Sequence, residues 1–183
     1  MRRIVTTPLT AEQLRPLRAG DRVSLHGTIY TARDAAHGRL VRALVAKETP
    51  PFPLRGALLY YTGPCPARPG RCIGSAGPTT SGRMDPYTPL LLAHGLRGML
   101  GKGPRSAAVI NGIKQFGAVY FAALGGAGAL LAQRIRTAEL IAYPELGPEG
   151  IYRLTVVNFP AYVAVDTEGN DIYALGRGNE IAN

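Results

Sequence analysis

Cysteine and lysine are scarce in this sequence, and no apolar run is long enough to cross a membrane. The 183 residues contain two cysteines, and all of their 21 basic residues except Lys47, Lys102 and Lys114 are arginine. A membrane-spanning helix needs about 20 mostly apolar residues, so the sequence predicts no such helix. The first residues, MRRIVTTP, lack the apolar region of a signal peptide. We therefore expect a cytoplasmic protein with no membrane partner.

The two cysteines restrict the metal chemistry open to the chain. Cys65 and Cys72 flank a segment rich in proline and glycine, and their spacing differs from the C-x-x-C of zinc and thioredoxin-like sites. An iron–sulfur cluster usually takes three or four cysteine ligands, so this chain cannot hold one alone. A structural disulfide is unusual in the cytosol. We expect two ordinary, partly buried thiols and no metal site.

Acidic residues are also few, which leaves a formal net charge of +9. Such basicity is compatible with nucleic-acid binding. However, the arginines are scattered from Arg2 to Arg177 without a dense run, and the few aromatic residues do not alternate with them. The composition therefore favours a solvated basic surface that would also attract a small anionic substrate, and we expect no nucleic-acid partner. A non-catalytic module that binds a small anion or RNA is the alternative.

The length and the element pattern indicate one α/β domain covering residues 1–183. Alternating apolar residues predict a strand over 22–30, and short apolar runs predict buried strands at 57–62, 99–101 and 117–123. Helices are predicted after the capping box that begins at Thr10, and over 34–47, 85–95, 105–116 and 129–134. Further strands are predicted at 3–6, around Ile73, and at 139–142, 151–156 and 161–165.

The segment 74–85, GSAGPTTSGRMD, is the most distinctive stretch of the chain. Its glycines let a backbone approach a ligand closely, and Pro78 stiffens the turn. Hydroxyls come from Thr79, Thr80 and Ser81, and Arg83 adds a planar fork suited to a carboxylate or phosphate. These residues predict an anion-binding loop, with an ordinary tight connection as the alternative.

Two further cations occupy comparable places in the chain. Arg33 follows the predicted strand 22–30, and Lys102 follows the strand 99–101. Loops at strand ends commonly carry sites in α/β sheets, so with Arg83 these cations could bind a four-carbon dicarboxylate. A surface ion pair with Asp34 or Glu48 is the alternative for Arg33. We expect His37 to order its loop.

The segment 74–85 resembles the signature loop of class I iron–sulfur fumarases and tartrate dehydratases, in their C-terminal domain or separate β subunit. Other segments resemble the family in the same order, namely TARDAAH at 31–37, GKGPRS at 101–106, YPELG at 143–147 and GND at 169–171. The resemblance runs from about Pro8 to about Tyr173. It implies an α/β fold of the swivelling β/β/α type, with mixed sheets and flanking helices.

The resemblance also implies a reaction, the reversible hydration of fumarate to L-malate in the tricarboxylic acid cycle. A [4Fe–4S] cluster would be held by a partner α subunit and not by this chain, in an (αβ)2 hetero-oligomer, with a homodimer possible for the isolated chain. L(+)-tartrate is the alternative substrate.

Site roles follow from the same resemblance. Thr79 matches the proposed general base of the family, and an acidic residue of the partner is expected to take its proton, because a hydroxyl alone is a poor base. Arg33 and Arg83 match carboxylate-binding arginines, and Lys102 matches the substrate-binding lysine. Thr80 also belongs to the substrate-binding set, where it and Arg105 are weaker candidates that would shape the loops. Pro104 stands where the family has asparagine.

Overall fold

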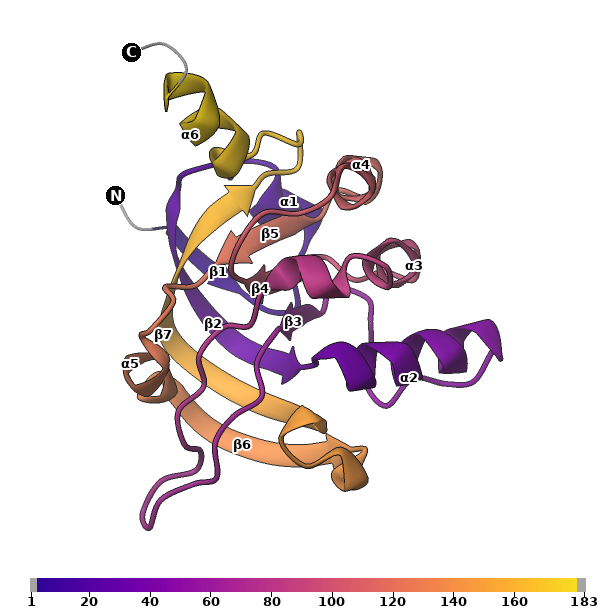
Figure 1. Cartoon of the computed structure of the whole chain (residues 1–183), viewed down its shortest axis with the longest axis vertical. Coiled ribbons are helices and arrows are strands. Elements are labelled where there is room, and N and C mark those ends of the chain that lie inside the picture. The colour runs from indigo at the N-terminus through magenta and orange to yellow at the C-terminus, as the bar shows by residue number, and fades with distance from the viewer. Residues whose placement is uncertain (1–2, 181–183) are drawn as a thin grey trace.

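One mixed sheet of seven strands organises the molecule, as Figure 1 shows. The computed structural model describes the backbone of residues 3–180 and the side chains of residues 3–176. The strands are β1 (Arg3–Thr6), β2 (Arg22–Thr31), β3 (Leu58–Tyr60), β4 (Gly98–Gly101), β5 (Val119–Ala122), β6 (Ile135–Ala142) and β7 (Ile151–Val165). Their order in the sheet is β1-β2-β3-β4-β5-β7-β6.

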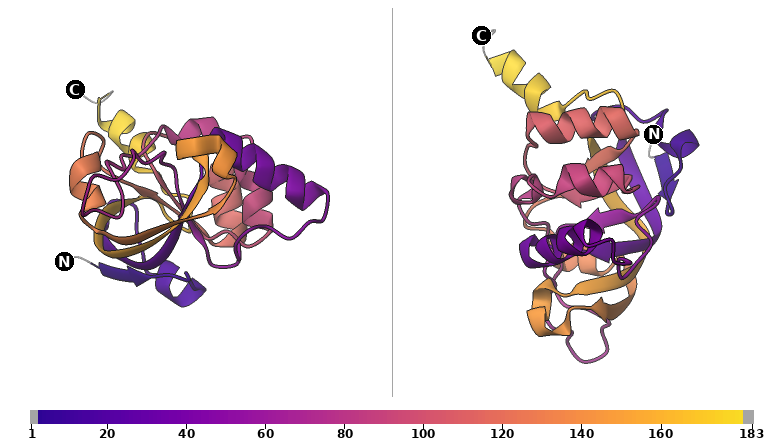
Figure 2. Two further views of the ribbon diagram at one scale, coloured as in Figure 1. Left: turned by 90° about the horizontal axis from the view of Figure 1, so that it is seen from below. Right: turned by 90° about the vertical axis from the view of Figure 1, so that its right-hand side faces the viewer.

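The sheet is partly closed because β7 pairs with both β5 and β2. Strands β1 to β5 run parallel, whereas β7 is antiparallel to β5 and also to β2. These pairings join β2, β3, β4, β5 and β7 into a ring, which is seen from below in the left view of Figure 2. A hydrophobic core that includes Leu25, Tyr60, Phe121 and Phe159 forms one side of this sheet.

Three helices cover the other side of the sheet. They are α2 (Asp34–Val45), α3 (Thr88–Ala93) and α4 (Ala107–Phe116), stacked one above another in the right view of Figure 2. A second core, which includes Leu40, Leu91, Met99 and Ile113, lies with them. The remaining helices are α1 (Ala11–Leu14), α5 (Gly128–Ala132), α6 (Ile172–Glu180) and the 3-10 turns η1 (Ser81–Met84) and η2 (Pro144–Glu149). This architecture confirms the predicted α/β class with flanking helices, although the described strands form one mixed sheet and not several. The swivelling β/β/α type stays a prediction.

Most of the predicted elements are present, and the differences have structural reasons. The Thr10 capping box is confirmed, with the Thr10 hydroxyl and the Gln13 side chain both hydrogen-bonded. The two strands predicted at 151–156 and 161–165 are one continuous β7, because an irregularity in its pairing with β2, between Leu25 and Gly27, accommodates the intervening residues. The strand predicted around Ile73 is absent, and α6 was not predicted.

The helix predicted from residue 85 begins later than expected. A 3-10 turn, η1, occupies residues 81–84, and α3 begins only at Thr88, with its proline at one of the first two helical positions. Pro86 therefore lies in the connection between them rather than in the first turn of the helix.

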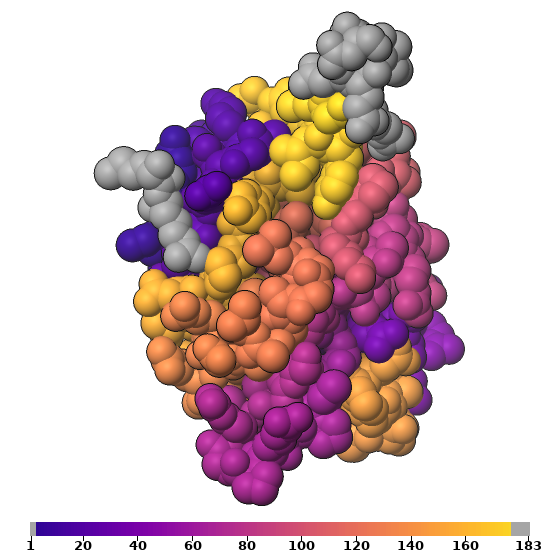
Figure 3. Space-filling model, turned by 60° about the vertical axis from the view of Figure 1, so that its left-hand side comes forward, coloured from indigo at the N-terminus to yellow at the C-terminus, as the bar shows by residue number. Residues whose placement is uncertain are grey.

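A long loop between β3 and η1 extends away from the sheet. It forms the magenta lower end of the face shown in Figure 3, beside the orange segment that contains α5. The prediction of partly buried thiols is wrong, because Cys65 and Cys72 are both free and exposed on this loop. Cys72 Sγ lies 3.5 Å from the Ile135 carbonyl oxygen at the beginning of β6, but this single contact leaves the residue exposed.

Candidate functional site

The predicted cations follow neighbouring strands at the carboxyl edge of the parallel sheet. The peptide N–H of Ala32, just before Arg33, donates to the Tyr60 carbonyl at 3.1 Å. Lys102 directly follows β4, and the N–H of Tyr61 donates to the Leu100 carbonyl at 2.8 Å. The backbones at Arg33 and Lys102 are therefore separated by β3 alone, on the edge where α/β sheets commonly bind ligands.

Residues 79–81 of the predicted anion-binding loop are hydrogen-bonded to this same edge. The N–H of Thr79 donates to the Tyr61 carbonyl at 2.6 Å, and the N–H of Lys102 donates to the Thr79 carbonyl at 3.3 Å. The N–H of Ser81 in turn donates to the Lys102 carbonyl at 2.8 Å. Thr80 and Lys102 thus form a parallel bridge, and the Thr79 backbone lies between the ends of β3 and β4.

Two buried tyrosines anchor the loop from below. The Tyr60 hydroxyl donates to the Ala76 carbonyl, and the Tyr120 hydroxyl lies 2.9 Å from Ser81 Oγ and 2.8 Å from the Gly103 carbonyl oxygen. Burial raises the pKa of both phenols above the ordinary value, so both keep their protons at neutral pH. Neither tyrosine was predicted to have a role at the site, because no local sequence signal distinguishes a core tyrosine that anchors a loop.

The glycine-rich segment 124–128 also packs on this loop. The N–H of Ala76 donates to the Gly128 carbonyl at 3.2 Å, and a Cβ at Gly128 would overlap the Ser75 hydroxyl. These contacts hold the beginning of α5 against the loop.

Arg83 is held by a carboxylate of its own chain. Its Nε and Nη2 donate to Asp34 Oδ1 and Oδ2 at 3.0 and 2.8 Å, a bidentate pair that joins η1 to the first turn of α2. Because Asp34 follows Arg33 directly, this pair connects Arg83 to the chain segment that carries Arg33.

Arg33 has a different acidic neighbour from those predicted. Its Nε lies 3.4 Å from Oε1 of Glu149, at the end of η2, and not beside Asp34 or Glu48. The two atoms lack hydrogen-bond geometry, so the buried Nε of Arg33 has no hydrogen-bond partner among the described residues.

His37 orders this corner, as predicted. Its Nδ1 lies 2.8 Å from the Arg33 carbonyl oxygen, and its ring meets the Tyr61 ring edge-on with centroids 5.1 Å apart. Burial lowers the pKa of His37 to about 4, so the imidazole is neutral at pH 7. Within the described part of the chain, His37 Nε2 and the Tyr61 hydroxyl are buried without hydrogen-bond partners.

Arg105 lies beneath the loops with a fully buried side chain. Its Nε donates to Asp85 Oδ1 at 2.7 Å, its Nη2 donates to Thr88 Oγ1 at 2.9 Å, and its guanidinium lies over the Tyr61 and Tyr120 rings. These contacts agree with the predicted loop-shaping role. The pairing of Arg105 with Asp85 was not predicted, because Asp85 lies twenty positions earlier in the chain.

The side chains of the described residues do not fit an iron–sulfur cluster or another bound metal. Among residues 3–176, no three His, Cys, Asp or Glu side chains lie close enough together to hold a metal ion.

No helix in the described part of the chain is both long and apolar enough to span a bilayer. The cytoplasmic location stays a prediction of the sequence.

Comparison with known proteins identifies relatives along nearly the whole chain. Residues 1–176 match the model of the family described as fumarase C-terminus. The chain is 41% identical to the anaerobic class I fumarate hydratase of Escherichia coli K12 over 173 residues, covering 93% of the chain and 32% of that protein. Fumarate hydratase 2 of Leishmania major is 39% identical, with 89% of this chain and 29% of that protein covered.

A third relative has a length similar to that of this chain. The Methanocaldococcus jannaschii protein assigned as L(+)-tartrate dehydratase subunit beta is 38% identical over 172 residues, covering 90% of the chain and 88% of that protein. In contrast, the chain spans only about a third of the length of the two fumarate hydratases. With this sheet, this loop and these matches, the chain belongs to the fumarase C-terminus family, whose members named here are hydro-lyases.

Proposed function

We propose that this chain is the β subunit of a two-chain hydro-lyase that reversibly hydrates fumarate to L-malate. The observation that carries the proposal is the set of backbone hydrogen bonds that brings Arg33, Thr79 and Lys102 to one edge of the sheet. A four-carbon diacid offers two carboxylates, and each can take charge-assisted hydrogen bonds from a cation.

Arg33 and Arg83 would bind the substrate carboxylates. The bidentate pair with Asp34 uses Nε and Nη2 of Arg83, and the hydrogen bonds between described residues leave its Nη1 without a partner. Asp34 can therefore orient this guanidinium while Nη1 binds substrate. Glu149 would hold Arg33 by charge alone, since the two groups make no hydrogen bond. Lys102, exposed after β4, would supply the third positive charge.

Thr79 would act as the general base. Dehydration of malate removes a proton from the carbon beside a carboxylate, and the hydroxyl leaves from the neighbouring carbon. A threonine hydroxyl accepts that proton only if another group first takes its own. No side-chain hydrogen bond to the Thr79 hydroxyl is found among residues 3–176, so we assign the proton acceptor to an acidic residue of the partner. Thr80 would bind substrate through its exposed hydroxyl.

The partner α subunit would hold the [4Fe–4S] cluster, which supplies Lewis-acid chemistry at the departing hydroxyl when bound. In this arrangement residues 1–183 form a single swivelling domain that closes its carboxyl edge over the partner, in an (αβ)2 assembly in the cytoplasm. The isolated chain would form a homodimer. The similarity to a tartrate dehydratase β subunit over 88% of its length supports the two-chain arrangement.

The same relative favours a second candidate substrate, L(+)-tartrate. The two diacids would share the carboxylate-binding cations, and tartrate carries one hydroxyl more than malate. Comparing kcat/KM for malate and for both tartrate enantiomers separates the two possibilities, because the native substrate should be turned over at least tenfold more efficiently.

The proposal is tested by purifying the chain with its cluster-bearing partner and measuring malate formation. Arg83→Ala should lower kcat/KM on the order of 100-fold. This corresponds to a loss of about 3 kcal/mol in transition-state binding, because a desolvated carboxylate loses its partner. Arg83→Lys should recover part of this loss, since it keeps the charge but not the bidentate geometry.

Arg39→Ala is the matched control. Arg39 lies within α2 and forms a surface ion pair at 2.9 Å from Glu145. It belongs to none of the loops assigned to the candidate site, so activity should stay near that of wild type. Wild-type turnover in Arg83→Ala would contradict the proposal, and steeply salt-dependent RNA binding by an inactive complex would favour the non-catalytic module.

A further inference from the structure

A basic hollow lies at the opposite edge of the sheet from the candidate site. Its volume is about 690 Å³, and its polar lining includes Arg15, Arg18, Arg97, Lys114, Thr167 and Glu168. Arg15 and Arg18 precede β2, Arg97 precedes β4, and Lys114 precedes β5. Thr167 and Glu168 follow β7, which runs antiparallel, so all of these segments meet at the amino edge of the parallel strands.

The hollow is separate from the predicted diacid site. Arg97 and Lys102 flank the four residues of β4, which span roughly 13 Å at about 3.3 Å per residue. A ligand of the size of malate cannot contact both edges of the sheet at once. The cations of the hollow are therefore not used by the proposed reaction.

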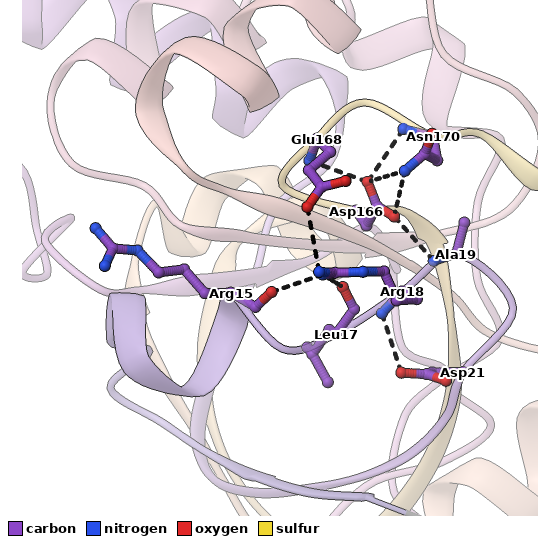
Figure 4. Close-up of polar contacts among 8 residues, drawn as sticks. All are labelled: Arg15, Leu17, Arg18, Ala19, Asp21, Asp166, Glu168 and Asn170. Atoms are coloured by element: carbon purple, nitrogen blue, oxygen red, sulfur yellow. Dashed lines mark hydrogen bonds and ion pairs between the residues drawn. The ribbon is translucent and has the colours of Figure 1, made fainter.

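The lining carries four positive side chains and one negative side chain. Arg18 Nη2 lies 3.2 Å from Glu168 Oε1, which offsets one of the charges. Arg97 Nη1 donates to two backbone carbonyls, those of Leu92 and Leu96, which orient it without neutralising it. The exposed side chains of Arg15 and Lys114 make no ion pair with any described residue, and Figure 4 shows Arg15 extending away from the other labelled side chains. About three positive charges thus remain unmatched.

A hydrogen-bond network fixes one wall of the hollow. Oδ2 of the buried Asp166 accepts from the Ala19 N–H at 3.1 Å and from Asn170 Nδ2 at 2.9 Å, and Oδ1 accepts from the Glu168 N–H at 3.0 Å (Figure 4). Asp166 is thus engaged with the backbone and does not project into the hollow. The stem of Lys114 packs directly over Gly169 of the same turn.

We propose that this hollow binds a small oxyanion carrying about three negative charges. Guanidinium and ammonium groups bind phosphate and carboxylate oxygens through charge-assisted hydrogen bonds, and the volume suits a small molecule. The ligand is either a phosphorylated compound or a tricarboxylate, which share this chemistry. The site depends on this chain alone.

Calorimetric titration of the full chain with pyrophosphate, citrate and succinate at constant ionic strength tests the proposal. Pyrophosphate, citrate or both should bind at least tenfold more tightly than the dianion succinate. Binding of pyrophosphate alone identifies a phosphate ligand, and binding of citrate alone identifies a tricarboxylate. The absence of millimolar binding by both probes would overturn the proposal.

Paired double variants separate a built site from general attraction by a basic protein. Arg15→Ala with Lys114→Ala should weaken binding on the order of tenfold, since two exposed charge contacts are lost. Arg42→Ala with Arg136→Ala removes the same charge from exposed positions elsewhere and should leave affinity unchanged. Equal losses in the two pairs would also overturn the proposal.

The readout is independent of the partner subunit and of turnover. A failure of hydratase activity would therefore leave the titration result intact, and a failure of the titration would not affect the proposed reaction. The circular dichroism of each double variant should match wild type, because all four substituted residues are exposed.

Discussion

Arg83 and Arg105 show how differently two arginines beside the same loop are used. Arg83 is half exposed and paired at the surface with Asp34, whereas Arg105 has a fully buried side chain paired with Asp85. A cation buried in this way costs free energy unless it is paired and hydrogen-bonded, and Arg105 is both. The family resemblance assigned substrate binding to Arg83 and only a loop-shaping role to Arg105. Local composition could not separate them, because their burial depends on residues far away in the chain.

His37 should make stability depend on pH in the mildly acidic range. Its pKa is about 4 in the folded protein and 6.5 when unfolded, so between these values the unfolded chain binds the extra proton. The free energy of unfolding therefore falls as pH drops from about 6.5 to about 4, by about 3 kcal/mol from this residue. Urea unfolding of the wild type at pH 7 and at pH 4.5 should show most of this loss. The variant His37→Asn, whose side chain keeps an N–H near the position of Nδ1, should lose much less stability between the same two pH values.

His94 offers a matched control for this measurement. Its Nδ1 lies 2.9 Å from the Leu90 carbonyl oxygen, four residues earlier, which is the same local contact that His37 makes with Arg33. His94 is exposed, so His94→Asn should leave the pH dependence as in wild type. An unchanged pH dependence in His37→Asn would contradict the assignment.

Helices and strands with strong local signals were predicted well. The strand predicted at 22–30 is β2 (Arg22–Thr31), and the helix predicted at 105–116 is α4 (Ala107–Phe116). The break predicted between residues 156 and 161 does not exist, because β7 pairs with β2 on both sides of it. That pairing is long-range, so a reading of neighbouring residues could not detect it.

At Gly101, the last residue of β4, residues 79–81 pack directly against the strand. A Cβ on this residue would overlap the Ser81 hydroxyl and come within 3.0 Å of the Tyr61 ring. Gly101→Ala should therefore push residues 79–81 away from β4 and lower the free energy of unfolding by about 1–3 kcal/mol. In the proposed complex, kcat/KM should fall further than this stability loss explains, because Thr79 and Lys102 are hydrogen-bonded to each other at this point.

Gly38→Ala provides the comparison for the same substitution. Gly38 lies inside α2, and a Cβ there meets no atom within 4 Å. The substitution should raise stability by about 0.5–1 kcal/mol through helix propensity and leave activity unchanged. A Gly101→Ala protein as stable and active as wild type would show that the loop does not depend on this close contact.

The two cores of the molecule are built on opposite faces of the same strands. In β3, Leu58 and Tyr60 belong to one core and Leu59 belongs to the other. In β5, Phe121 belongs to the first of these cores and Tyr120 to the second. Alternation along a strand makes this division unavoidable. Neither core can therefore persist after the sheet is lost.

The full chain should accordingly unfold in one cooperative transition, as a single domain does. Far-UV circular dichroism of the backbone and near-UV circular dichroism of its nine tyrosines should give the same urea midpoint. Leu58→Ala and Leu59→Ala remove side chains from different cores. Each should lower the free energy of unfolding by about 2–5 kcal/mol and should lower the urea midpoint seen by both probes. Separate transitions for the two probes would show that residues 1–183 are not one domain.

Short-range patterns in the chain were sufficient for the elements and for the chemical nature of the candidate residues. Strand alternation, capping residues, the glycine-rich loop and the positions of Arg33 and Lys102 after strands all depend on interactions within a few residues, which are visible in the sequence. The closure of the sheet through β2 and β7 was not visible. The pairing of Arg83 with Asp34 and the basic hollow were not visible either. Each of these brings together segments far apart in the chain, and their contacts arise only when the apolar faces of those segments pack around shared cores.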